Sequence, residues 1–381
     1  MLLLKKKHLF FYNSIIIIIN MEKKILILII IVSSVLCVLA LVLGLVFGLK
    51  KYEDNNSNKN EVNVVNSYHN TEELSSKYSV MNPTNVKEGL EKNIQNRLLN
   101  GFENWNQGFE TWKAWGNILY TNDSIYNVHG ARLSLASYQE AMDQSLKQTT
   151  ILMGEFHNML ITDEFTAIHY DFLSGKPGAL EKLRVMEFVK FKDYGGELGT
   201  RVVEGWGSTK DADGEGLKRA FQKEKERAEQ EEQDNYIKNY IIPNSDDLKE
   251  KYIIKNPTEY IDDNAENILN IILSGFESWN SGITSYLEWV DNNYDSNAIS
   301  SSLDENDRTM NEYKGNMTEL FNKEKIEKLY FDNILIRDNW AGLHYRYRRK
   351  RIDNGNLIDF GDRMEFLHFN NELKITGSWI Q

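Results

Sequence analysis

The sequence predicts an α+β protein with two tandem domains behind an N-terminal transmembrane helix. Three observations support this: an internal repeat offset by 174 or 175 residues, a shift within each copy from helical to strand periodicity, and a long uncharged run near the N-terminus. Helices followed by a run of strands are typical of α+β domains. Each copy is therefore expected to pack a curved antiparallel sheet on its N-terminal helices.

The repeat is clearest in two stretches that end similar helices. Residues 101–108 read Gly-Phe-Glu-Asn-Trp-Asn-Gln-Gly, and residues 275–282 read Gly-Phe-Glu-Ser-Trp-Asn-Ser-Gly. Apolar residues lead into both stretches at steps of three or four, which predicts a helix with one buried stripe. The glycine that ends each stretch fits the left-handed residue that often terminates a helix.

Further matches keep their order and spacing through both copies. They include Asn70 with Asn244, Phe156 with Phe331, His169 with His344, and Trp206 with Trp379. A period this long indicates a duplicated domain, since solenoid units run about 20–50 residues. We predict a first repeat over 70–208 and a second over 244–381. The charged segment 209–243 is expected to be a solvated helical linker, with a partner-binding helix as the alternative.

Within each copy, helices are expected to come first and strands after them. In the first copy, Trp112 falls in a predicted short second helix, and residues 135–146 in a third. Strands are predicted over 165–173, 183–192 and 198–206, because turn residues separate these apolar runs.

The N-terminus carries the predicted membrane anchor. Residues 25–49 contain no charge and are long enough to span a bilayer, whereas the apolar core of a signal peptide has about 7–15 residues. Five lysines precede the run and two follow it, which places residues 1–24 in the cytoplasm and the body outside the cell or in a lumen. Residues 50–69 are expected to form a flexible tether.

Two features of this segment leave alternatives open. Met21 is a second candidate start, in which case residues 1–20 are not part of the protein. Ala40, Gly44 and Gly48 form a ridge of small residues that could join two membrane helices into a homodimer. The alternative is that such residues are simply frequent in membrane helices.

Composition excludes several classes of function. The net charge of −12 argues against nucleic acid as a partner. The only cysteine, Cys37, lies in the uncharged run, so neither a disulfide nor a cysteine-based metal site is expected in the body. The sequence contains no phosphate loop, nucleophile elbow or metal-binding motif, and we expect no metal and no cofactor.

On these residues, each copy resembles a SnoaL-like domain of the NTF2-like superfamily. The similarity lies in the Asn-x-Gly that ends the first helix, in the turn from Tyr120 to Ile125, and in the closing tryptophan. It covers both units. The resemblance implies a cone-shaped fold with an apolar pocket at its open end. It also implies pairing through the outer face of the sheet, so we expect the two repeats to form an intrachain pseudo-dimer.

The superfamily includes proton-transfer enzymes, and four residues are candidates for such a role. His169 and Glu187 lie on adjacent strands of the first copy, as do His344 and Glu365 in the second. A histidine and a glutamate paired across a hairpin could act as base and orienting group. The alternative is a polar pair on the solvated face of the sheet.

The predicted ligand pocket is aromatic. Its expected lining residues are Trp105, Trp112, Tyr126, His129 and Tyr170 in the first copy, and Trp279, Tyr286 and Tyr345 in the second. Ser300 stands near the place of Tyr126 in the second copy, so the two pockets are expected to differ.

Two functions remain open at this point. One is a membrane-anchored protein that binds a small apolar ligand or acts as a scaffold. The other is a cofactor-free isomerase, cyclase or hydratase that uses pocket His and Glu as acid and base. The resembled cyclases carry a Gly-Thr-His-Thr-Gly signature, where this chain has residues 175–178 reading Gly-Lys-Pro-Gly. The superfamily hosts both classes, so the fold alone cannot choose between them. The missing histidine favours the binding protein.

Overall fold

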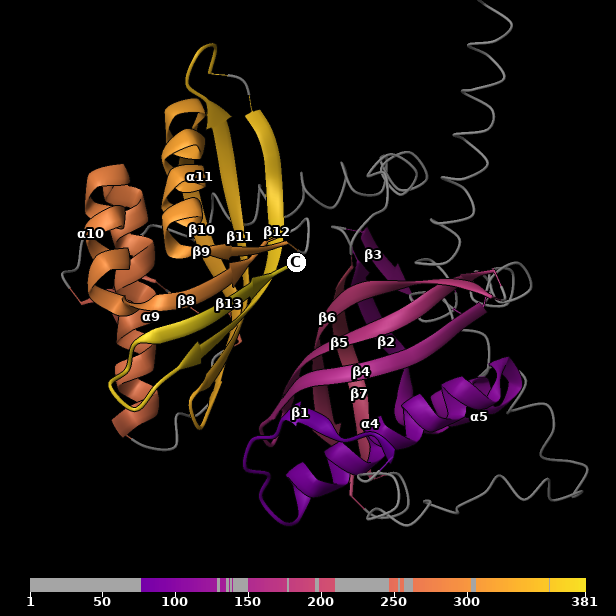
Figure 1. The fold of residues 1–381 in the computed structure, drawn as a ribbon. Helices are drawn as coiled ribbons and strands as arrows, with labels where there is room; N and C mark the ends of the chain where they lie inside the picture. The colour runs from indigo at the N-terminus through magenta and orange to yellow at the C-terminus, as the bar shows by residue number, and fades with distance from the viewer. Residues whose placement is uncertain are drawn as a thin grey trace, which may run out of the picture.

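The structure is a computed structural model (Figure 1). It describes residues 77–128, 131–134, 137, 139, 150–176, 178–195, 199–209, 247–252, 254–256, 263–302, 306–355 and 357–381. The predicted membrane anchor, tether and linker lie outside these residues, as do His129 and nearly all of the third helix expected in the first copy. Among the described helices, none combines the length and the apolar character that crossing a membrane requires.

The first domain packs two helices on a seven-stranded sheet. The helices are α4 (Leu90–Gln107) and α5 (Phe109–Leu119). The strands are β1 (Val80–Asn82), β2 (Tyr120–Val128), β3 (Ala131–Ser134), β4 (Thr150–Ile161), β5 (Phe165–Lys176), β6 (Ala179–Asp193) and β7 (Thr200–Thr209). They lie in the order β1-β4-β5-β6-β7-β2-β3.

The second domain repeats this plan and has two further described helices, one before the pair and one after it. Its helices are α8 (Leu248–Lys251), α9 (Asp263–Ser281), α10 (Ile283–Asn293) and α11 (Met310–Lys323). Its strands are β8 (Tyr294–Ser301), β9 (Asp307–Thr309), β10 (Glu324–Arg337), β11 (Trp340–Arg351), β12 (Leu357–Phe369) and β13 (Ile375–Ile380). They lie in the order β10-β11-β12-β13-β8-β9, so α+β tandem domains are observed.

Both sheets are mixed, which corrects the expectation of wholly antiparallel sheets. Strands β4 to β7 and β10 to β13 form antiparallel meanders. However, β2 pairs with β7 and β8 with β13 in parallel, and β1 pairs with β4 in parallel. Parallel neighbours need a long connection. The other strands of each meander lie within the connection from β2 to β7 or within that from β8 to β13.

The glycine of the repeated stretch allows two helices to cross closely. In the second domain, a Cβ atom on Gly275 of α9 would lie 2.5 Å from the ring of Trp289 on α10. Gly101 of α4 meets Trp115 of α5 in the same way. Each helix pair can therefore pack a half-buried tryptophan against bare backbone, which a residue larger than glycine would prevent.

The glutamate of the stretch anchors the segment that precedes the helix. Glu103 accepts a hydrogen bond from the Tyr78 hydroxyl over 2.5 Å, and Glu277 accepts one from Tyr252 over 2.5 Å. Burial alone would raise the pKa of Glu103, but hydrogen bonds from Lys77, Tyr78 and another side chain lower it to about 2. The carboxylate therefore stays ionised and holds this tyrosine.

The glycine after each helix has the positive φ that was predicted. Gly108 has φ 127° and ψ 174°, and Gly282 has φ 108° and ψ 175°. These angles lie beyond the left-handed helical region, in a region essentially restricted to glycine. Each glycine ends one helix and directly precedes the next, so the chain turns within a single residue.

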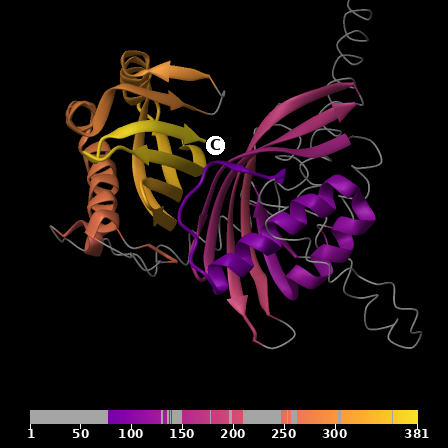
Figure 2. The ribbon, with the colours of Figure 1, turned by 60° about the horizontal axis from the view of Figure 1, so that its bottom comes forward.

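The two sheets contact each other through their outer faces, away from the helices (Figures 1 and 2). The contact is an apolar cluster in which most residues have a counterpart in the other repeat. It contains Leu160 and Leu335, Met186 and Met364, Phe188 and Phe366, Trp206 and Trp379, and also Phe165, Ala167 and Trp340. A Cβ atom on Gly342 would lie 2.8 Å from the Cβ of Ala167, so the backbones approach closely at its centre.

Candidate functional site

Each domain has a cavity lined by one glutamate of its sheet, with α4 and α5 beside it in the first domain and α9, α10 and α11 in the second. Glu187 lies on β6 and Glu365 on β12, and each lines a cavity in its own domain. The two positions are equivalent in the sheets, because Glu187 pairs with Gly207 and Glu365 with Ile380 on the closing strand. Both glutamates were predicted as candidates, and both lie in a cavity.

The cavity of the second domain has a volume of about 360 Å³. Its wall is rich in aromatic residues, and Met317 and Leu320 from α11 add to the apolar surface. The aromatic residues are Phe276, Trp279, Tyr286, Trp289, Tyr294, Tyr313, Tyr345 and Tyr347. Polar groups are few, and Glu365, Arg308 and Arg363 carry the charges. A concave, mostly apolar cavity with a few placed polar groups is typical of a small-molecule site.

The cavity of the first domain measures only about 50 Å³. The Tyr126 side chain fills the space, and its hydroxyl donates a hydrogen bond to Glu187 Oε1 over 2.6 Å. A Cβ atom on Gly205 would lie 2.5 Å from the Tyr126 ring, so this glycine makes room for the phenol. The first domain therefore carries a built-in aromatic group where the second domain has open space.

The register of the sheets identifies the residue that replaces Tyr126 in the second domain. Tyr126 pairs with Gly205, and Ser300 pairs with Ser378, at equivalent points of the closing strands. Ser300 lines the larger cavity, and its hydroxyl accepts a hydrogen bond from Ser378 over 3.0 Å. The exchange of one phenol for one small hydroxyl therefore lies at the position where the cavities differ.

Burial changes the protonation of both glutamates. Desolvation raises the pKa of Glu187 to about 7, although hydrogen bonds from Tyr126 and Tyr170 oppose the rise. Desolvation likewise raises the pKa of Glu365 to about 7 against the hydrogen bond that Tyr345 donates over 3.2 Å. Part of the Glu187 side chain is exposed, but it lines the cavity. Burial therefore governs the pKa of this carboxyl group. A carboxyl group with a pKa near 7 can exchange protons at neutral pH.

The tyrosine hydroxyls of the larger cavity stay protonated. Burial raises the pKa of Tyr286, Tyr313 and Tyr345 well above the ordinary value of 10.0. The Tyr286 and Tyr313 hydroxyls lie 2.6 Å apart in a hydrogen bond. The wall therefore offers neutral hydroxyl groups as well as ring surface.

The two candidate histidines lie on the opposite face of the sheet from the cavities. His169 pairs with Met186 and not with Glu187, so the expected His–Glu pair does not form. His169 packs 5.5 Å from the Phe366 ring of the second domain, and His344 packs 5.6 Å from the Phe188 ring of the first. Both histidines are buried between the domains, which excludes the solvated-face alternative as well. Desolvation lowers the pKa of His169 well below its ordinary value.

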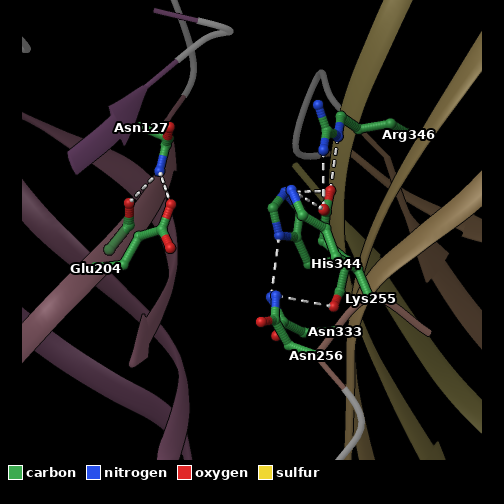
Figure 3. Close-up of polar contacts among 9 residues, drawn as sticks. Asn127, Glu204, Lys255, Asn256, Asn333, His344 and Arg346 are labelled. Atoms are coloured by element: carbon green, nitrogen blue, oxygen red, sulfur yellow. Dashed lines mark hydrogen bonds and ion pairs between the residues drawn. The ribbon is translucent and has the colours of Figure 1, made fainter. Parts of the chain in front are cut away.

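A buried ion pair lies next to His344, as Figure 3 shows. Arg346 donates two hydrogen bonds to Asp332, from Nε over 2.6 Å and from Nη2 over 2.8 Å. His344 Nε2 lies 3.9 Å from the same carboxylate. Burial would raise the pKa of Asp332, but the charge and hydrogen bonds of the Arg346 guanidinium lower it overall. Figure 3 also shows a polar contact of the first domain, the hydrogen bond that Asn127 Nδ2 donates to Glu204. The two atoms lie 3.1 Å apart.

One cluster in the first domain has residue types that could bind a metal ion. Glu155, His157 and Asp171 place their ligand atoms within 4.8 Å of one another, which the sequence did not predict. Lys182 already lies between the acids, with Nζ 2.8 Å from Glu155 and 2.7 Å from Asp171. The ammonium group therefore supplies the positive charge that these carboxylates require.

The predicted aromatic residues fall in the two cavities. Trp105, Trp112, Tyr126 and Tyr170 line the smaller one, and Trp279, Tyr286 and Tyr345 line the larger one. His129 lies outside the described residues.

Sequence reasoning missed the contribution of α11 to the larger cavity. Tyr313, Met317 and Leu320 follow one another at steps of four and three, the spacing of one helix face. Thr309 and Glu312 form a capping box at the start of this helix, which was a further sequence signal. No sequence pattern marked Arg308 or Arg363 as residues of the cavity wall.

Comparison with solved structures gives similarity to SnoaL-like and NTF2-like proteins. A candidate SnoaL-like polyketide cyclase from Mesorhizobium loti matches at 11% identity, covering 30% of this chain and 97% of that one, with a TM-score of 0.25. An NTF2-like protein of unknown function from Cytophaga hutchinsonii matches at 14% identity, covering 30% and 88%, with a TM-score of 0.23. A candidate SnoaL-like isomerase from Agrobacterium tumefaciens matches at 12% identity, covering 30% and 93%, with a TM-score of 0.22.

The sequence comparisons give no further relatives. No protein-family model matches the chain, and no curated protein matches it. Likeness to solved structures at this level does not extend to activity, so the functional argument depends on the cavities themselves.

Proposed function

We propose that the second domain binds a small apolar ligand and that the first domain is a scaffold for it. The observation that carries this proposal is the difference in volume between the cavities, about 360 Å³ against about 50 Å³. The larger cavity offers aromatic surface with a carboxyl group at Glu365. Such a wall favours a largely aromatic ligand with one polar group that can hydrogen-bond to this glutamate.

The first domain supports this choice of ligand. There the Tyr126 phenol occupies the cavity and donates to Glu187, the counterpart of Glu365. A free hydroxyaryl compound could make the corresponding contacts in the second domain, where Ser300 leaves the space open. 2-Naphthol is therefore a suitable probe, because it combines a fused aromatic ring with one hydroxyl donor.

The test is to fill the larger cavity in the way that the smaller one is filled. The double variant Ser300→Tyr with Ser378→Gly copies the Tyr126 and Gly205 arrangement of the first domain. We expect wild-type protein to bind 2-naphthol and the double variant to lose at least about 20-fold in affinity, because the phenol would occupy the ligand's volume.

Isothermal titration calorimetry measures this difference. Ser378→Gly alone is the matched control and is expected to bind as wild type does, since it leaves the cavity open. Equal binding by the double variant and the wild type would contradict the proposal, as would an absence of binding to the wild type.

A second candidate function rests on the raised pKa of Glu365. A cavity carboxyl group with a pKa of about 7 suits proton transfer in a cofactor-free isomerase, cyclase or hydratase. The test is exchange of the acidic CH protons of 2-tetralone in D₂O, followed by NMR. Catalysed exchange that increases as pH passes through 7 and disappears in Glu365→Gln supports the enzyme. Exchange at the uncatalysed rate would contradict the enzyme and leave ligand binding as the proposed function.

We further propose that residues 25–49 anchor the chain in a membrane with the body outside the cytoplasm. Two observations support this: the run is uncharged and long enough to span a bilayer, and more lysines precede it than directly follow it. Protease treatment of intact cells and of sealed microsomes tests the orientation. Cleavage of the body in sealed microsomes without detergent, together with protection in intact cells, would overturn it.

A further inference from the structure

Arg184 extends from the first domain into the second. It lies on β6, is buried, and directs its guanidinium group at the end of β8 and at the C-terminal strand β13. Nη2 donates to Ser301 Oγ over 2.8 Å. Nη1 lies within hydrogen-bonding distance of three backbone oxygens, at 3.3 Å from Ile380, 3.4 Å from Ser302 and 3.5 Å from Ser301.

These acceptors belong to the wall of the larger cavity. Ser300, Ser302 and Ile380 line that cavity, and Ser301, the last residue of β8, lies between the two serines in the sequence. Arg308, which also lines the cavity, donates to the Ser302 hydroxyl. One side chain of the first domain therefore holds two wall segments of the second domain together from outside.

We propose that Arg184 is a positioning residue for the ligand cavity of the second domain. This inference rests on the proposed function, since it assumes that the larger cavity binds a ligand. The guanidinium group has five donors in a planar fork, which lets one side chain hold several acceptors in a fixed arrangement. Without it, carbonyl groups of Ser301, Ser302 and Ile380, buried or part-buried at the ends of β8 and β13, lose the Arg184 donor, and the wall between them relaxes.

This role explains why a repeat with a filled cavity can still contribute to binding. The Tyr126 phenol occupies the first domain's own cavity, yet Arg184 on its outer face stabilises the shape of the second. The first domain then acts on ligand affinity through the wall and does not contact the ligand.

A second arginine provides a matched control. Arg337 lies on β10 of the second domain and crosses the interface in the opposite direction. It donates to the Ile161 carbonyl from Nε over 3.1 Å and from Nη2 over 2.6 Å, and it pairs with Glu91. The described lining of the larger cavity contains none of these three residues. Arg337→Lys thus loosens the contact between the domains without altering the cavity wall.

The experiment compares Arg184→Lys with Arg337→Lys in the full-length chain. Both variants keep the charge and lose the planar fork. 2-Naphthol is titrated by calorimetry against detergent-solubilised protein, with detergent alone as the blank, and the melting temperature of each variant is measured. We expect Arg184→Lys to weaken binding by about five- to tenfold, and Arg337→Lys to change it by less than about twofold at a similar loss of thermal stability.

Ser301→Ala provides a second test that does not depend on the arginine variant folding. It removes the oxygen that accepts from Nη2 and is expected to weaken 2-naphthol binding by about threefold. Equal losses in Arg184→Lys and Arg337→Lys would overturn the inference, because general loosening of the interface would then explain both. Unchanged binding in Arg184→Lys and Ser301→Ala would overturn it too. Failure of the wild type to bind 2-naphthol would instead contradict the proposed function.

Discussion

The raised pKa of Glu365 makes the folded state sensitive to pH. The carboxyl group titrates near 4.5 in ordinary surroundings and near 7 in the cavity, so the folded protein holds the proton more tightly than the unfolded chain. The resulting stabilisation is complete below pH 4.5 and is lost as pH rises through 7. Glu187 contributes in the same direction, because its pKa is also about 7.

We therefore expect the free energy of unfolding to fall between pH 4.5 and 7, with Glu365 contributing about 2–3 kcal/mol of the fall. Glu365→Gln should flatten the profile by that amount, since glutamine does not titrate. Denaturant unfolding at several pH values measures the effect. Parallel profiles for the variant and the wild type would show that burial does not govern this group.

Tyr126 offers a second test at the residue scale. Tyr126→Ala should create a cavity in the first domain and reduce stability by about 2–5 kcal/mol, because a buried ring and its bond to Glu187 are lost. p-Cresol, which has the same phenol group, should restore part of the melting temperature, whereas toluene should restore less. Tyr194→Ala at an exposed site is the control. It should leave stability unchanged, and neither compound should raise its melting temperature more than that of the wild type. An equal response to both compounds would contradict a specific hydroxyl contact.

The sequence predicted the glutamates but not the faces on which they lie. Alternation of polar and apolar residues normally distinguishes the two faces of a strand. In β5, residues from Phe165 to Phe172 are buried on both faces, because helices cover one and the other domain covers the second. With both faces buried, the sequence could not show that His169 and Glu187 point in opposite directions.

At the scale of the helices, the sequence showed that Gly101 and Gly275 are repeated, but it did not show that they allow two helices to cross closely. The repeated Gly-Phe-Glu stretch predicted two equivalent helices, and both are observed. The approach of Trp289 to Gly275 depends on how the second helix folds back, which periodicity does not specify.

Gly275→Ala is expected to reduce stability by about 1–3 kcal/mol, because the added methyl group would overlap the Trp289 ring. Gly315→Ala is the matched control, since a Cβ there meets open space on α11. It should raise stability by about 0.5–1 kcal/mol through helix propensity. Thermal unfolding of both variants measures the difference. Stabilisation by Gly275→Ala would show that the helices do not cross as described.

At the scale of the whole chain, the duplication allowed both domains to be predicted. The face through which they meet came from the family resemblance and not from any residue pattern. The histidines were predicted to lie either in the pocket or in a polar pair on the solvated face, because a contact with a second domain is not encoded in the periodicity of the first. We propose that the contact between the sheets persists in solution as an intrachain pseudo-dimer.

Gly342→Leu tests this pseudo-dimer. Its side chain would enter the space against Ala167, where even a Cβ would lie 2.8 Å away, and should force the sheets apart. We expect a larger radius of gyration by small-angle scattering of residues 70–381, together with a lower melting temperature. Gly315→Leu adds the same side chain at an open site and should leave the scattering unchanged. Scattering from the wild type that shows two separated lobes would contradict the pseudo-dimer.

The unequal cavities also determine how many ligand molecules one chain can take. A homodimer of identical subunits presents two identical sites by symmetry. Joining the two copies in one polypeptide removes that constraint, so that Tyr126 can close one site while Ser300 leaves the other open. Under the proposed function, we therefore expect saturation at one ligand molecule per chain, whereas a symmetric dimer with one open cavity in each subunit would bind two.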